Sequence, residues 1–182
     1  MDDDPDFALV RRFRDGDRTA FGELVVRYQA PVYKAAFWVL RNADDAKDVA
    51  QDVFVKVAER IDEFDPRFRF FSWIYRIAVN ESLNALRRHR REESLDEDFD
   101  ASAGESADPE WQLAEAQTSR RVRGALLTMG TNDRTVLALR HFGECSYGEI
   151  ARILDIDEKT VKSRLFDARQ RLREMLQDLR QS

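Results

Sequence analysis

Apolar side chains recur along most of this chain at intervals of three and four residues, the spacing that places them on one side of an α-helix. One series runs through Val49, Val53, Val57 and Ile61 and starts just after Asn42, a residue type that favours helix N-termini. The alternation of apolar and polar residues that marks a half-buried strand is missing, and glycines and prolines stand mostly at the ends of the apolar series. The pattern predicts an all-α protein.

A second apolar series, at Phe21, Leu24 and Tyr28, comes before Pro31. Proline has no backbone N–H to donate and its ring clashes with the preceding turn, so it usually ends or kinks a helix. The sequence therefore predicts one helix that stops near Pro31 and another through residues 32–40.

The segment 92–110 differs from the rest of the chain in composition. It has nine acidic residues, no basic residue and only two large apolar ones, which is typical of a linker without a core of its own. It closes at 108–110 with Asp-Pro-Glu, which supplies a helix N-cap, a proline suited to the first helical position and an acid for the first turn. We therefore expect two small helical domains, residues 1–91 and 111–182, joined by an acidic flexible linker over residues 92–110.

Two helices separated by a break of three residues are predicted in the second domain. The first follows Ser146, and Glu149 completes the Ser-x-x-Glu spacing of a capping box. The second is long, basic in its outward residues, and starts at Glu158. A short helix, a turn and a longer basic helix form the pattern of a helix-turn-helix DNA-binding domain.

The long C-terminal helix has an apolar face at Val161, Leu165, Ala168 and Leu172. If this face points inward, the opposite side of its first half presents Lys159, Lys162, Ser163, Phe166 and Arg169. The N-terminal half of a recognition helix is the part that enters a major groove. A helix that only closes a bundle would show a similar pattern, so DNA binding is one of two interpretations of this helix alone.

Residues 67–76, RFRFFSWIYR, contain five aromatic residues and three arginines. Phe71 and Tyr75 belong to a broad apolar face and are expected in the core. On the other side a strip repeats at intervals of four and three residues: Trp73, Ile77, Asn80, Asn84, Arg87 and Arg91. Carboxamides can bond to base edges, arginines can hold phosphates, and aromatic rings can stack on unpaired bases. The strip is a candidate surface for melted DNA.

The energy of strand separation implies a partner. Opening five base-pair steps costs about 7 kcal/mol, whereas each captured base returns only about 1–3 kcal/mol by stacking. A strip of this kind could hold an opened strand but not open the duplex alone. We expect a partner that contributes further DNA contacts.

The composition excludes several other classes of protein. Cys145 is the single cysteine, and His89 and His141 stand far apart, so neither an internal disulfide nor a zinc site is expected. The acidic first residues are unlike a signal peptide, and the longest apolar run is too short to cross a membrane. The net charge of −5 conceals basic blocks on both sides of the acidic segment. We expect a cytoplasmic protein with no cofactor, no metal, no membrane insertion and no small-molecule substrate.

Three stretches carry a resemblance to a known family: DDAKDVAQDVFVKVAERIDEF, FFSWIYRIAVNESLNALRRHRR and CSYGEIARILDIDEKTVKSRLFDARQRL. In this order they resemble bacterial RNA polymerase sigma factors of the extracytoplasmic-function (ECF) group, sigma-70 relatives reduced to domains two and four. The resemblance covers nearly the whole chain. It implies a factor, not an enzyme, that binds core RNA polymerase and directs initiation at promoter DNA. It also implies a sequestering anti-sigma factor.

The resemblance assigns roles to residues in each stretch. The core-polymerase surface would contain Asp48, Gln51, Asp52 and Phe54. The minus-10 element would be held by Phe68, Arg69, Phe70, Trp73, Arg76, Asn80, Asn84, Arg87 and Arg91. The minus-35 element would be met by Lys159, Lys162, Ser163, Phe166, Asp167 and Arg169. From the residues alone, the acids of the first set could equally form a solvated face, and Phe54 could equally be a core residue.

Two positions depart from the family pattern. Asp155 stands where the turn usually has glycine, and an aspartate can adopt the left-handed conformation at modest cost. Asp167 stands where many members have arginine. This removes a phosphate or guanine contact and leaves a group that can only accept, for example from a cytosine amino group. The family's common minus-35 sequence is therefore not expected for this chain.

Several alternatives remain at the level of sequence. The acidic linker is either a solvating tether that keeps two basic domains apart or a run of carboxylates that occupies the RNA channel of the polymerase. Rival functions are a sigma-like decoy that binds an anti-sigma factor without promoter activity, a dimeric helix-turn-helix repressor and a small helical enzyme. Trp73 and Asn80 argue against the decoy, the N-terminal motifs argue against the repressor, and the sequence offers an enzyme no nucleophile–base pair or phosphate loop.

Overall fold

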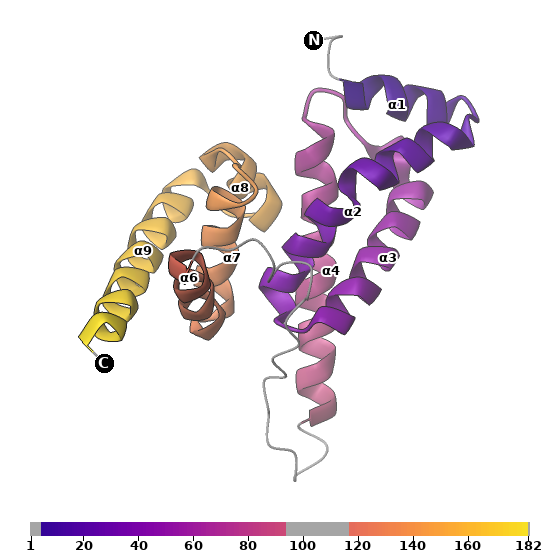
Figure 1. The fold of residues 1–182 in the computed structure, drawn as a ribbon. Helices are drawn as coiled ribbons and strands as arrows, with labels where there is room; N and C mark the ends of the chain where they lie inside the picture. Colours follow the sequence, from indigo (N-terminus) through magenta and orange to yellow (C-terminus); the bar gives the residue numbers. More distant parts are fainter. Residues whose placement is uncertain (1–4, 94–116, 182) are drawn as a thin grey trace.

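The computed structural model describes residues 5–93 and 117–181 (Figure 1). The first range forms α1 (Pro5–Arg14), α2 (Arg18–Leu40), α3 (Ala43–Arg60), the short 3-10 helix η1 (Ile61–Glu63) and α4 (Phe70–Glu93). The second forms α6 (Gln117–Thr128), α7 (Thr131–His141), α8 (Tyr147–Leu154) and α9 (Glu158–Gln181). No strand occurs in either range, which confirms the all-α prediction. The helix start expected at 108–110, and all but the first two residues of the predicted linker, lie outside the described residues.

The N-terminal group is a bundle in which α2, α3 and α4 pack against one another and α1 lies against α2 (Figure 1). The turn from α2 to α3 is set by Asn42, whose side-chain oxygen accepts hydrogen bonds from the backbone N–H groups of Asp44 and Asp45 at 2.9 and 3.2 Å. These bonds satisfy two of the free donors at the start of α3. The predicted apolar face of α3 is buried in the bundle, as expected: Val49, Val53 and Val57.

α2 runs without a break from Arg18 to Leu40 and has Pro31 in its interior. The prediction of two helices separated at Pro31 is therefore wrong. A proline costs a helix about 3 kcal/mol, but Leu24 before it and Val32 and Phe37 after it are buried in the same core. Full burial of one such side chain contributes about 1.5–3 kcal/mol, so the packing of one continuous helix outweighs the cost.

The C-terminal group contains the predicted helix-turn-helix, formed by α8 and α9. The capping box is present: Glu149 N donates to Ser146 Oγ at 3.2 Å, and Ser146 N donates to Glu149 Oε2 at 2.8 Å. The apolar face of α9 is buried at Val161, Leu165 and Ala168. These local predictions are confirmed because each depends on residues within a few positions of one another.

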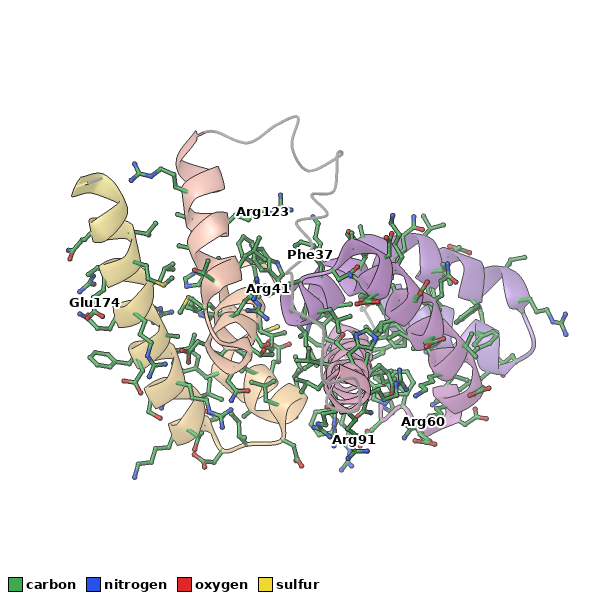
Figure 2. The ribbon with its side chains drawn as sticks, turned by 90° about the horizontal axis from the view of Figure 1, so that it is seen from below. Phe37, Arg41, Arg60, Arg91, Arg123 and Glu174 are labelled. Carbon is green, nitrogen blue, oxygen red and sulfur yellow. The ribbon has the colours of Figure 1, made fainter. Side chains whose placement is uncertain are left out.

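The two groups of helices lie against each other, with α2 on α7 and α4 on α8 (Figure 1). At one end of the contact, the rings of Trp38 from α2 and Phe142 after α7 stack with centroids 4.9 Å apart and an interplanar angle of 6°. Nearby, Arg123 of α6 reaches over the ring of Phe37 at 5.6 Å (Figure 2).

Arg134 of α7 lies between α7 and the end of α2 and is 2% exposed. Its guanidinium donates hydrogen bonds to the carbonyl oxygens of Trp38, Val39 and Met129. Trp38 and Val39 belong to the last turn of α2, where carbonyl groups lack partners within the helix. Burial, and to a smaller extent the charge of Arg41, lowers the pKa of Arg134 to about 10. The side chain is still charged at neutral pH and joins the end of α2 to α7.

We expect Arg134→Ala to lower the free energy of unfolding by about 3 kcal/mol, because buried carbonyl groups lose their donors. Urea denaturation followed by far-UV circular dichroism measures this. Arg173→Ala is the matched control, since Arg173 is exposed on α9, and its effect should stay within about 0.5 kcal/mol. Equal stability of the two variants would contradict a central role for Arg134.

Candidate nucleic-acid interface

A groove of about 620 Å³ lies beside α4, between this helix and the segment that connects it to α3. It brings together six of the nine residues expected to meet minus-10 DNA: Phe68, Trp73, Arg76, Asn80, Asn84 and Arg87. Asn80, Asn84 and Arg87 are exposed and point from one side of α4. Arg87 Nη1 lies 3.4 Å from Asn84 Oδ1, so a guanidinium and a carboxamide are neighbours in the groove.

Trp73 forms the aromatic part of the groove. Its ring is half-buried and packs against Phe64 and Phe70 at centroid distances of 5.6 and 5.7 Å. Phe70 itself is fully buried, so its predicted place near the DNA surface is corrected: it supports Trp73 from the core. Ile77 is also buried and lines the base of the groove, although the strip placed it outward. Both are drawn inward because α4 packs on several elements, which gives it a wider buried face than one apolar stripe predicts.

Glu81 is a groove residue that the sequence analysis missed. Its carboxylate lies 2.6 Å from Nζ of Lys56 on α3. The pairing offsets a negative charge that would otherwise oppose a phosphate backbone in the groove. Spacing within α4 contains no signal for this pair, because its partner comes from another helix.

Arg69 and Arg91 of the predicted minus-10 set lie outside the groove. Arg91 is exposed further along α4. Arg69 is exposed in the loop before α4, and its Nη1 lies 3.2 Å from Oε1 of Glu149 on α8. Phe68 borders the groove but also faces α8, where the guanidinium carbon of Arg152 lies 4.9 Å from the centroid of its ring.

The outer face of α3 carries the residues expected to meet the polymerase. Asp48, Gln51 and Asp52 are exposed, whereas Phe54 is half-buried and packs on the core. Val55 continues the exposed face and is 56% exposed. The sequence analysis did not include Val55. It follows Asp48, Gln51 and Asp52 by seven, four and three residues, which places it on the same side of the helix. The face thus joins carboxylates and a carboxamide to an exposed apolar side chain.

The first half of α9 presents all the residues predicted for it on its outward side. Lys159, Lys162, Ser163, Phe166, Asp167 and Arg169 are exposed. Phe166 is 71% exposed, which is high for an aromatic side chain. At the start of α9, Asp157 Oδ1 accepts from the backbone N–H of Thr160 at 2.7 Å, and this bond lowers the pKa of Asp157.

The turn between α8 and α9 passes through Asp155 in the left-handed conformation, with φ 54° and ψ 50°. The prediction that an aspartate takes the role of the usual glycine is confirmed. Its backbone N–H donates to the carbonyl of Ala151 and ends α8. The turn then directs α9 away from α8 in the helix-turn-helix arrangement.

The described ranges contain neither a candidate membrane span nor a candidate metal site. None of the helices there combines the length and apolarity that crossing a bilayer requires. The same residues contain no group of three or more His, Cys, Asp or Glu side chains that could hold a metal ion.

Comparison with known families identifies both halves of the chain. Sigma-70 region 2 matches residues 24–92, and Sigma-70 region 4 matches residues 119–172. The chain is 30% identical over 179 residues to ECF RNA polymerase sigma factor SigW of Bacillus subtilis, covering 93% of this chain and 96% of that protein. It is 35% identical over 185 residues to the ECF RNA polymerase sigma-E factor of Escherichia coli K12, covering 96% and 95%.

Solved structures show the same similarity. CnrH in complex with the cytosolic domain of CnrY has a TM-score of 0.72 at 27% identity, covering 96% of this chain and 99% of that chain. The sigma factor RpoE in complex with the anti-sigma factor NepR from Bartonella quintana has a TM-score of 0.75 at 25% identity, covering 86% and 96%. The fold and the matched regions define a bacterial sigma factor. The chain belongs to the ECF group of the sigma-70 family, whose members bind RNA polymerase and promoter DNA and are initiation factors rather than enzymes.

Because Asp155 has a left-handed backbone conformation, glycine at this position should destabilise the protein less than alanine does. We expect Asp155→Gly to be more stable than Asp155→Ala by about 1 kcal/mol, because a Cβ atom is unfavourable at positive φ. The matched control is Asp167, which is exposed within α9: there glycine should be less stable than alanine by about 1 kcal/mol. Urea denaturation of the four variants measures both differences, and the same sign at both positions would contradict the assignment.

Proposed function

We propose that this protein directs promoter-specific transcription initiation by core RNA polymerase. The observation that carries the proposal is the groove beside α4, where three aromatic residues, two carboxamides and three arginines line one surface. The same chain carries an exposed basic helix in a helix-turn-helix. The first surface suits single-stranded DNA and the second suits a duplex, which are the two forms of DNA at a promoter being opened.

The chemistry of the groove fits an unpaired strand. Trp73 can stack on an exposed base, and such stacking contributes about 1–3 kcal/mol per base. The carboxamides of Asn80 and Asn84 can both donate to and accept from base edges. Arg76 and Arg87 can hold phosphates. In this proposal Phe68 and Arg69 extend the same binding surface into the loop before α4.

The first half of α9 fits a major groove. Lys159, Lys162 and Arg169 would hold phosphates, while Ser163 and Phe166 would meet base edges and thymine methyl groups. Asp167 would favour a base pair with an amino group toward the protein, such as cytosine. This assigns minus-35 recognition to α9 with a preference of its own.

The outer face of α3 is proposed as the contact with core polymerase. Asp48, Gln51 and Asp52 would bind polar groups of the polymerase, and Val55 would add an apolar contact at the end of the strip. The function takes place in the cytoplasm, where the polymerase works, and needs no cofactor. By similarity to CnrH and RpoE, which were solved with CnrY and NepR, we also propose that an anti-sigma factor binds this protein.

Run-off transcription is the direct test. Fragmented genomic DNA of the source organism is transcribed by bacterial core polymerase with and without this protein, and new discrete transcripts are expected only in its presence. A control sigma factor establishes that the polymerase is active. If the control gives transcripts and this protein gives none, the chain is instead a decoy that binds an anti-sigma factor.

Asp167→Arg tests the reading role of α9. We expect this variant to select a different minus-35 sequence from a randomised promoter pool and to bind it about tenfold more tightly, since an arginine can contact guanine through two bonds. Glu174→Arg is the matched control because it reverses the same charge at an exposed position further along α9. Selection of the wild-type sequence by Asp167→Arg would count against a reading role.

A further inference from the structure

Arg14, the last residue of α1, holds the backbone where α3 passes into the loop before α4. Its Nε and Nη2 atoms donate to the carbonyl oxygen of Ile61 at 3.2 and 2.5 Å, and Nη2 also donates to that of Phe64 at 2.9 Å. Carbonyl groups at a helix C-terminus lack partners within the helix, and the rigid fork of a guanidinium can serve two of them at once. Arg14 thus ties the residues at the start of η1 and just after it to α1.

Phe64 is the point where this turn meets the groove beside α4. Its backbone leaves the helical path with φ −67° and ψ 121°, and its side chain is only 3% exposed. The ring contacts two helices: the centroid of Phe7 on α1 is 5.9 Å away, and that of Trp73 on α4 is 5.6 Å away. Trp73 is the ring proposed to stack on an unpaired base, so the position of Phe64 restricts where that ring can lie.

The first turn of α1 reaches the same aromatic cluster by a second route. Asp6 is buried and accepts hydrogen bonds from the hydroxyl of Tyr28 and the guanidinium of Arg27, both on α2. The ring of Tyr28 meets that of Phe70 edge-on at 5.3 Å, and Phe70 lies 5.7 Å from Trp73. Both ends of α1 are therefore connected to the rings that support Trp73.

Side-chain packing alone does not fix the loop against α1. A pocket of about 380 Å³ lies between them, lined by Val10 and Arg11 of α1 and by Pro66 and Arg67 of the loop. Well-packed interiors have few voids larger than a water molecule. The hydrogen bonds of Arg14 therefore supply a constraint that packing does not supply here.

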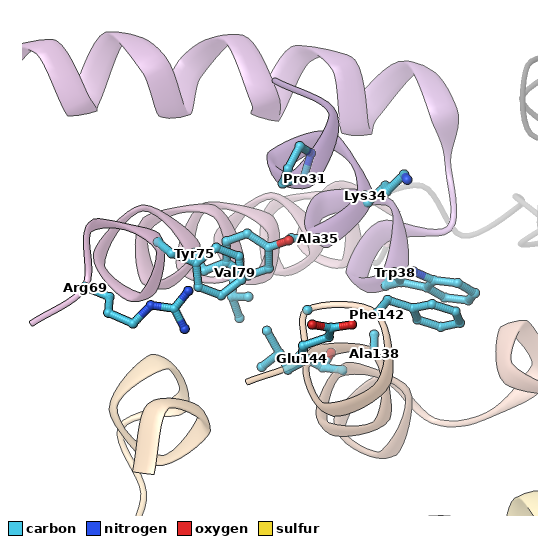
Figure 3. Close-up of a pocket in the computed structure, with 14 residues that line it drawn as sticks. Pro31, Lys34, Ala35, Trp38, Arg69, Tyr75, Val79, Ala138, Phe142 and Glu144 are labelled. Atoms are coloured by element: carbon cyan, nitrogen blue, oxygen red, sulfur yellow. The ribbon is translucent and has the colours of Figure 1, made fainter. Parts of the chain in front are cut away.

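The other side of the loop also borders a gap. A pocket of about 370 Å³ lies between the two domains, with Arg69 of the loop at one end and the stack of Trp38 and Phe142 at the other (Figure 3). Between these two gaps the loop is held by polar contacts at both ends: Arg14 acts at its start, and the pair of Arg69 with Glu149 acts at its end. Of these two contacts, that of Arg14 lies next to the ring that supports Trp73.

We propose that Arg14 is a positioning residue for the DNA-binding groove, because it fixes Phe64 and thereby the place of the Trp73 ring. The inference rests on the proposed function of the groove and extends that function to α1, which lies outside the match to Sigma-70 region 2 at residues 24–92. Arg14 acts through the geometry of its fork. Its ion pair with Asp62 is 3.6 Å long and the carboxylate is 88% exposed, an arrangement that contributes little.

Three variants separate geometry from charge. Arg14→Lys keeps the positive charge but has a single ammonium group in place of the planar fork, so it is not expected to hold both carbonyl groups. Arg14→Gln loses the charge as well as the fork. Arg11→Gln is the matched control, because Arg11 is exposed on the same helix and lines the pocket between α1 and the loop but not the groove.

The place of Trp73 is read from its indole N–H resonance in the isotopically labelled full chain, assigned by its loss in Trp73→Phe. Both Arg14 variants should shift this resonance, and Arg11→Gln should leave it unchanged. Far-UV circular dichroism establishes that each variant is folded, so that a shift reports the groove and not unfolding. An unshifted resonance in both folded Arg14 variants would overturn the positioning role.

Binding is measured with fluorescent single-stranded DNA of about 12 nucleotides and random sequence, a length within the usual site sizes of such surfaces. Arg14→Lys should bind about threefold to tenfold more weakly than the wild type, because part of the stacking on Trp73 is lost. Arg87→Ala, within the groove, should also weaken binding. Arg11→Gln should weaken it by less than about twofold, as expected for an exposed charge that does not line the groove.

The outcomes separate this inference from the function on which it rests. If Arg87→Ala weakens binding while Arg14→Lys binds like the wild type, Arg14 has no positioning role and the groove stands. If Arg11→Gln weakens binding as much as Arg14→Gln does, α1 contributes charge instead of geometry and the inference is wrong. If the wild-type chain binds no single-stranded DNA, the proposed function of the groove fails, and the inference fails with it.

Discussion

The hydrogen bonds from Arg134 to the end of α2 hold the described structure together. α2 belongs to the N-terminal bundle, yet its last carbonyl groups accept from a buried guanidinium of α7. A cation at a helix C-terminus is favoured by the helix dipole as well as by the unpaired carbonyl groups there. Because a buried charge is costly without partners, Arg134 and the end of α2 stabilise each other only while the two domains are together. This contact, together with the packing of α4 on α8, sets how the surfaces of the two domains lie relative to each other.

Two acidic residues within the proposed DNA-facing regions, Glu81 and Glu149, share one arrangement. Glu81 in the groove pairs with Lys56 of α3, and Glu149 on α8 pairs with Arg69. Each carboxylate is thereby offset by a cation from another element, which limits its repulsion toward phosphates. Asp167 differs because it is exposed on α9; Asp133 is the main cause of the raised pKa of Arg171, and the charge of Asp167 adds a smaller effect. In the proposed function, an exposed carboxylate on α9 would restrict the bases that this helix can contact and would give the protein its own promoter preference.

Much of the fold could be predicted from short-range patterns, and the errors have identifiable causes. The start of α3 at Asn42 and the turn at Asp155 were predicted because helix caps and left-handed turns depend on neighbouring residues. The prediction that a helix ends at Pro31 was wrong because the free-energy cost of one proline is smaller than the stabilisation gained by packing the whole helix. Phe70 and Ile77 were placed at the surface because spacing gives the direction of a side chain but not how many helices surround it.

The sequence by itself determined most of the helices, the helix-turn-helix, the family and six of the residues that line the groove. These follow from periodicity, capping and motif order, all of which act over short stretches of chain. Only the tertiary structure decided that Arg134 is buried between the domains and that Glu149 meets Ser72, residues separated by 77 positions. It also decided that the exposed side chain of Arg69 pairs with Glu149 of α8. Contacts between distant segments depend on how complementary surfaces pack, and no local pattern carries that information.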